Sequence, residues 1–352
     1  MNDQEIAWPE QGFQAFIRGL PWVILIPVCA FCSWFLCRQF LQGLMAPDEA
    51  AMASIGVSTM GAYVVTLFGL TEHWPLAAIT HKWGRGILMI IISLVLAGLF
   101  FIIIHNGFNV SLKSWAFPII ANSWLVLAAT SFVGGDFHLG HIPPVRRMVL
   151  NLIISVGFTL LLMRTIVIFP ATWFPFLQVT IVTGGLGYLF RKVKQPTFSV
   201  LVWALLMLLM FLFVGCAQLL GCYTLSGPVP QFWIFNLGHS TTPAFDVFFA
   251  FCCGMNFAVF ACLQCWPFRL IRQPFGTCAS LLCMLFWNWL LTLAAIPFIT
   301  GICTGDGGML ETQVFAWHTV FWGFAWVYCF GIGQSPYLWR GQKTPGTWDD
   351  VD

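Results

Sequence analysis

Acidic and histidine side chains gather in two short stretches of the first half of the chain. Residues 136 to 141 carry the pattern D-x-H-x-x-H, and the stretch from Thr71 to Gly86 carries a glutamate and two histidines. Carboxylates and imidazoles are ligands that suit zinc or non-haem iron. The candidate ligands for a divalent metal are Glu72, His73, His81, Asp136, His138 and His141.

A metal centre would require these two stretches to converge, and it would then support a hydrolytic or oxygen-using reaction. The pattern lacks the H-E-x-x-H spacing of a zinc site on one helix. It also lacks the repeated histidine boxes of membrane hydroxylases and desaturases. The sequence therefore favours the alternative, in which these histidines are interfacial residues of loops close to a membrane.

A second set of polar residues lies inside long apolar runs. A charged or imidazole side chain that faces the interior of a helix bundle is a candidate for function, because exposure to lipid is costly. Arg164 would attract an anionic solute or extend to the outer interface, and His318 would carry a proton or bind a substrate. Asn256 and Asn288 complete the candidate substrate-binding set, although hydrogen bonds between helices are the favoured role for asparagines.

The elements that must position these residues are helices in a membrane. The chain has 352 residues, of which 59% are hydrophobic and only 8% charged, too little polar surface for a soluble protein of this length. Its apolar runs are continuous and reach the roughly 20 residues that a membrane-spanning helix needs. We predict an all-α polytopic integral membrane protein with ten transmembrane helices, at about 21–45, 51–71, 86–105, 115–135, 148–169, 173–190, 198–222, 246–266, 276–300 and 312–333.

The basic residues predict the orientation of these spans. Assigning alternate loops to one face gathers all but three of the 15 Lys and Arg residues there, the exceptions being Arg38, Lys113 and Arg164. By the positive-inside rule this face and both termini are cytoplasmic. We therefore expect a bacterial inner-membrane protein with a cytoplasmic amphipathic segment at 1–20, a transmembrane domain at 21–333 and a cytoplasmic tail at 334–352.

Two corners of the chain resemble each other. Trp74-Pro75 and Trp266-Pro267 lie 192 positions apart, as do Gly84 and Gly276. This spacing indicates helical hairpins with internal repeats, which in membrane proteins often form transport pathways at their interfaces. The alternative is that Trp and Pro recur at membrane boundaries for physical reasons alone.

Cysteines do not form a convincing metal site. The 13 cysteines include four on one apolar run, where cysteine usually behaves as a small hydrophobic residue: Cys252, Cys253, Cys262 and Cys265. Cys222 and Cys303 are expected near the ends of two external loops, where an oxidising compartment would allow a disulfide.

Three functions are compatible with these features. A transporter or permease for a small organic solute, anionic or aromatic, is favoured; the near absence of intramembrane carboxylates, with Glu72, Asp246 and Glu311 near span ends, argues against cation coupling. The alternatives are an integral subunit of a larger complex, acting as a scaffold or a quinone- or lipid-adjacent anchor, and a metal-dependent membrane enzyme. The expected partners are the lipid bilayer, the solute, and other membrane subunits or further copies of this chain. Nucleic acid is excluded, since the basic residues are dispersed.

Overall fold

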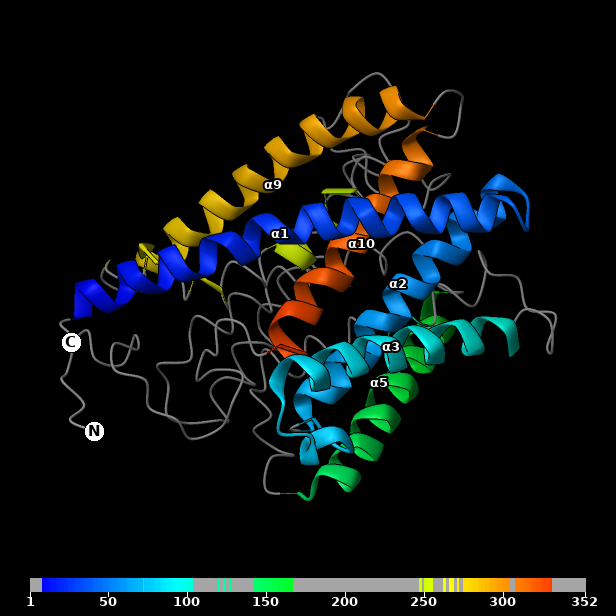
Figure 1. Ribbon diagram of the computed structural model, residues 1–352, viewed down its shortest axis with the longest axis horizontal. Helices are drawn as coiled ribbons and strands as arrows, with labels where there is room; N and C mark the ends of the chain where they lie inside the picture. Colours follow the sequence, from blue (N-terminus) through cyan, green and yellow to red (C-terminus); the bar gives the residue numbers. More distant parts are fainter. Residues whose placement is uncertain are drawn as a thin grey trace.

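The structure is a computed structural model that describes residues 8–71, 73–103, 120, 123–124, 127, 142–166, 247–248, 250–255, 262–263, 266–268, 271, 275–303 and 308–330. Within these residues it contains helices and no strand (Figure 1). The helices are α1 (Trp8–Gln42), α2 (Pro47–Leu70), the short 3-10 helix η1 (Leu76–Ala78), α3 (Lys82–Ile102), α5 (Pro144–Ile166), α9 (Phe275–Ile302) and α10 (Gly308–Tyr328).

Six of these helices coincide with six of the ten expected spans. Four of their starts, expected at 51, 86, 148 and 312, are observed at 47, 82, 144 and 308. Each of these helices opens with a proline, glycine or charged residue, so hydropathy alone places the start too late. Of the other four expected spans, 173–190 and 198–222 lie wholly outside the described residues, and 115–135 and 246–266 are described only in part. A count of ten therefore remains a prediction.

Local sequence explains where the helices begin. Pro47 opens α2, where its missing N–H costs nothing, and Asp48 and Glu49 bring negative charge to the positive end of the helix dipole. At the start of α3, His81 is the N-cap residue: its Nδ1 accepts the N–H of Gly84 at 3.0 Å. α1 is continuous through residues 20 and 21, so the expected amphipathic segment is helical from Trp8 and joins the first span directly.

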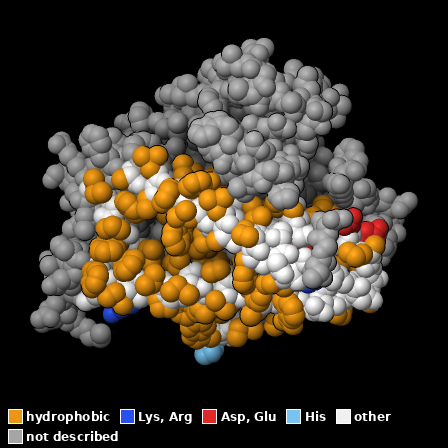
Figure 2. Space-filling view, turned by 90° about the horizontal axis from the view of Figure 1, so that it is seen from above, with side chains coloured by type: hydrophobic (Ala, Val, Ile, Leu, Met, Phe, Trp, Pro, Cys, Tyr) orange, Lys and Arg blue, Asp and Glu red, His pale blue; other side chains and the backbone are white. Residues whose placement is uncertain are grey.

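Four described helices are long and apolar enough to cross a membrane, judged by length and composition. They are Phe16–Gln42 within α1, α2, α3 and Leu282–Ile302 within α9. This agrees with an integral membrane protein. Large hydrophobic side chains are exposed along α1, α3, α5 and α9. Figure 2 shows such side chains over most of the described surface in view, with the few charged groups at its margins. Lipid is the natural environment of such a surface.

α10 and α2 form the centre of the described structure. Most residues of both helices are buried, whereas most described residues of α1, α3 and α9 are partly or fully exposed. α10 packs against α2, α1 and α9, and α2 packs in addition against α3 and α5. Large aromatic side chains fill the space between them, and Trp34, Trp124, Trp317, Phe324 and Tyr328 are among the largest that are completely buried.

Glycine allows another helix to approach α10 closely. A Cβ atom added at Gly254 would lie 2.7 Å from the backbone oxygen of Thr319, and one added at Gly323 would lie 2.6 Å from the backbone oxygen of Gly254. Side chains on either residue would force the two backbones apart. Small residues at such contacts are a common means of packing helices in membranes.

The two corners that resemble each other in sequence also share their local backbone structure. The Trp74-Pro75 and Trp266-Pro267 peptide bonds are both cis. Each corner has the same two backbone hydrogen bonds at equivalent positions, 3.0 to 3.1 Å long: Trp74 to Thr71 and Ile79 to Leu76 in the first corner, and Trp266 to Leu263 and Ile271 to Phe268 in the second. Duplication of whole hairpins remains a prediction, because much of the second repeat lies outside the described residues.

Candidate functional site at the junction of α1, α2 and α10

The two described residues of the predicted metal set have other partners. His73 has a positive φ of 65°, and its Nε2 lies 2.9 Å from the backbone oxygen of Tyr328 at the end of α10. His81 uses Nδ1 to cap α3, as described above. Both contacts explain these imidazoles as parts of the corner between α2 and α3.

The remaining predicted ligands, Glu72, Asp136, His138 and His141, lie outside the described residues. Among the residues that are described, no group of three or more His, Cys, Asp or Glu side chains is close enough to hold a metal ion. The metal centre is therefore without support from this part of the chain.

Among the predicted substrate-binding residues, His318 has hydrogen-bond partners on two other helices. It lies in the middle of α10 and is 4% exposed. Its Nδ1 is 2.7 Å from Ser33 Oγ on α1, and its Nε2 is 3.0 Å from Ser54 Oγ on α2. A single imidazole thus joins three helices, at sequence separations of 285 and 264 residues.

The hydrogen bonds around His318 can be satisfied without a charge. A neutral imidazole donates from one ring nitrogen and accepts at the other, and each serine hydroxyl can play the complementary part. Trp322 donates its Nε1–H to Ser33 Oγ at 2.9 Å, and Ser33 is also 3.1 Å from the backbone oxygen of Ala30. The result is a chain of exchangeable protons that passes from α10 to α1, back to α10, and on to α2.

The other predicted substrate-binding residues do not join this junction. Asn288 is fully buried in α9, where its Nδ2 donates to the backbone oxygen of Met284 in the same helix at 2.8 Å. The interhelical role that we favoured for the asparagines stays a prediction. Arg164 lies within α5, but its side chain is not among those described, and Asn256 lies outside the described residues.

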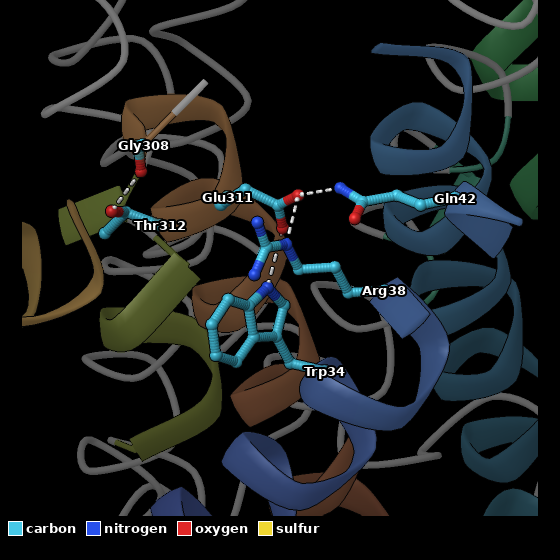
Figure 3. Close-up of polar contacts among 6 residues, drawn as sticks. All are labelled: Trp34, Arg38, Gln42, Gly308, Glu311 and Thr312. Atoms are coloured by element: carbon cyan, nitrogen blue, oxygen red, sulfur yellow. Dashed lines mark hydrogen bonds and ion pairs between the residues drawn. The ribbon is translucent and has the colours of Figure 1, made fainter. Parts of the chain in front are cut away.

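A second polar cluster lies two turns before His318 and was missed by the sequence analysis. Glu311 lies in the first turn of α10, as expected for a residue near a span end, yet it is only 7% exposed. Trp34 Nε1 donates to its Oε2 at 2.8 Å, and Gln42 Nε2 donates to its Oε1 at 3.2 Å. Arg38 Nε forms an ion pair with Oε1 at 3.3 Å. Figure 3 shows the three side chains of α1 converging on this carboxylate.

Two signals in the sequence point to this cluster in retrospect. Trp34, Arg38 and Gln42 recur every four residues, which places them on one face of a helix. Arg38 is also one of the three basic residues that violate the charge pattern of the loops. Its ion pair with Glu311 explains that exception, because the guanidinium is held within the helix bundle.

The described cysteines of the apolar run are buried. Cys252, Cys253 and Cys262 lie in the packed interior, and among the described residues they form no disulfide. Cys303 is a buried free thiol at the end of α9, and Cys222, its proposed disulfide partner, lies outside the described residues.

The site described here thus consists of a hydrogen-bonded imidazole network and a buried carboxylate with a guanidinium partner, both on the face of α10 that α1 covers. Comparison of the chain with protein-family models, with curated proteins and with solved structures finds no match.

Proposed function

We propose that this protein is a membrane transporter or permease for a small organic solute, and that the solute passes beside the junction of α1, α2 and α10. The observation that carries the proposal is His318, a buried ionisable residue whose two ring nitrogens contact serines of two other helices. Ionisable residues within membrane helices are costly, and they commonly mark the pathways of solutes, ions or protons.

The contacts between α1 and α10 suit a helix that moves better than a helix that is fixed in place. α1 is mostly exposed, and in its second half it is joined to α10 by hydrogen bonds and an ion pair. Polar contacts of this kind can be exchanged for contacts with water or with a solute at little cost. Two arrangements of α1 against α10 would then be close in free energy, as alternating access requires.

The location and orientation belong to the same proposal. We place the protein in the bacterial inner membrane with both termini in the cytoplasm, since this orientation puts most of the basic residues on the cytoplasmic face. Arg38 then lies toward the external end of α1, and the Arg38–Glu311 pair lies between His318 and the external face.

The test is accumulation in liposomes. The purified protein is reconstituted, the liposomes are incubated with a small-molecule extract of the source cells, and the trapped compounds are identified by mass spectrometry. We expect at least one small organic compound to be enriched over protein-free liposomes. Liposomes that contain folded protein and trap nothing beyond the control level would contradict the proposal.

A further inference from the structure

The donors around Glu311 are those of a carboxylate-binding site. In this structure the carboxylate that they bind is the protein's own Glu311 side chain. A guanidinium, an indole N–H and a carboxamide N–H, all from α1, meet a single carboxylate from α10 (Figure 3). Arginine is the preferred partner of carboxylates in buried sites because its donors match their geometry. A solute that carries a carboxylate would find the same donors suitable.

Arg38 has N–H donors that do not contact Glu311. Its contact with Glu311 is an ion pair at Nε, and this buried Nε forms no hydrogen bond within the described residues. The ion pair leaves both Nη groups out of contact with Glu311. A guanidinium has five N–H donors in a fixed fork, so a second carboxylate can be received on the Nη side. The Arg38 side chain is 20% exposed, whereas that of Glu311 is 9% exposed. The arginine is therefore the more accessible member of the pair.

The surroundings of Arg38 are aromatic. Its guanidinium carbon lies 6.0 Å from the centroid of the Trp34 ring. Phe31 and Phe315 pack against the same indole, with ring centroids 5.4 and 6.3 Å away. An aromatic ring attached to a carboxylate would match both features, because its ring would pack with these side chains while its charge meets the guanidinium.

We propose that Arg38 binds the carboxylate of an aromatic organic anion, and that Glu311 is the internal competitor that takes up one proton when the anion binds. This inference rests on the proposed transport function and adds the class of solute. The charges balance: the resting pair of Arg38 and ionised Glu311 is neutral. The bound state pairs Arg38 with the solute carboxylate and leaves Glu311 as a neutral acid. Uptake of the anion is therefore coupled to uptake of a proton.

Among the residues that the structure describes, few other ionisable groups lie near this pair. Cys303 at the end of α9 lies within electrostatic reach of both Arg38 and Glu311, and a thiol is ordinarily uncharged at neutral pH. His318 lies two turns further along α10, and the carboxylates of Asp48 and Glu49 are exposed at the start of α2. Within the described residues, Glu311 is thus the group best placed to give up its charge as an anion arrives at Arg38.

The probe is benzoate, with benzamide as its uncharged analogue. Binding to the full-length protein in lipid nanodiscs is measured by calorimetry, in buffers of different ionisation enthalpy, so that proton uptake is counted directly. We expect benzoate to bind with uptake of close to one proton, and benzamide not to bind. Affinity should fall as the pH rises, because ionised Glu311 then competes for Arg38.

Glu311→Gln tests the competitor at nearly the same side-chain shape. Its amide oxygen can replace Oε2 and accept from Trp34 Nε1, and its amide nitrogen, in place of Oε1, can donate to the Gln42 carboxamide once that amide is turned over. This variant should bind benzoate about tenfold more tightly, and without proton uptake. Arg38→Gln should lose binding. Arg18→Gln, at an exposed arginine of the same helix, is the matched control and should bind as the unmodified protein does.

Each outcome decides the inference. Absence of benzoate binding to both the unmodified protein and Glu311→Gln, binding without proton uptake, or equal affinities in Arg38→Gln and the unmodified protein would each overturn it. The proposed function is judged separately by accumulation in liposomes. Enrichment of a compound that is not an anion would leave transport standing and remove only the role given to Arg38.

Discussion

Arg147 on α5 donates a hydrogen bond from Nη1 to the backbone oxygen of Leu70, the last residue of α2, over 3.0 Å. Its Nη2 donates to the backbone oxygen of Ile142 at 3.1 Å, and the residue is 4% exposed. The carbonyls at the end of a helix lack partners within the helix and carry partial negative charge. Arg147 thus caps α2, whereas its neighbour Arg146 is exposed.

This contact predicts different effects for two adjacent arginines. Arg147→Ala should destabilise the protein by about 1–3 kcal/mol, because a buried carbonyl loses a charged donor. Arg146→Ala should leave stability almost unchanged. Thermal unfolding of both variants in the same detergent measures the difference, and equal unfolding temperatures would show that Arg147 has no capping role.

The approach between α10 and residues 250–255 predicts that Gly254→Ala is destabilising. The added methyl group would meet the backbone of Thr319, which cannot move aside as a flexible side chain can. We expect a loss of about 1–3 kcal/mol. Gly98→Ala in α3 is the control, since a Cβ there has no atom within 4 Å. A destabilisation shared by both variants would point to a general effect of replacing glycine.

The network around His318 predicts that two substitutions differ in stability. His318→Leu leaves Ser33 and Ser54 without their partner and should cost about 1–3 kcal/mol. His318→Gln retains a donor and an acceptor on one side chain, so it should cost less. Unfolding temperatures in detergent compare the two. A leucine variant as stable as the unmodified protein would show that the imidazole does not hold the three helices together.

The distribution of basic residues in the loops predicts which side of the membrane the first two loops face. Alkaline phosphatase, active only outside the cytoplasm, is fused after Ala46, between α1 and α2, and after His81, before α3. The first fusion should be active and the second inactive, and a fusion after Asp352 should be inactive as well. The reverse pattern would require an inverted topology and would move the Arg38–Glu311 pair to the cytoplasmic side.

The sequence was sufficient to predict six described helices because each is a continuous apolar run with a polar boundary. It selected His318 as a candidate because an imidazole within such a run is unusual, and the role of His318 stays a prediction. It did not identify Ser33 or Ser54, since a serine in an apolar helix is ordinary and its facing partner lies more than 260 residues away in sequence.

Glu311 shows a different limit. Its place near the end of a span was predicted correctly, but the sequence does not reveal that three side chains of α1 surround it. Because Glu311 is buried, the interior of the helix bundle does contain a carboxylate. The sequence argument against coupling transport to cations, including protons, therefore no longer holds. Pairing between helices at opposite ends of a chain depends on tertiary packing, which no local pattern encodes.

The most direct test of the account is the initial rate at which reconstituted liposomes accumulate the compound that the unmodified protein enriches. The comparison includes His318→Gln and, as a matched histidine control, His81→Gln at the exposed start of α3. We expect His318→Gln to lower the rate about tenfold or more, equivalent to roughly 1.4 kcal/mol of activation free energy, and His81→Gln to retain it. Equal rates in all three proteins would contradict a pathway at the junction of α1, α2 and α10, and absence of accumulation by the unmodified protein would contradict transport itself.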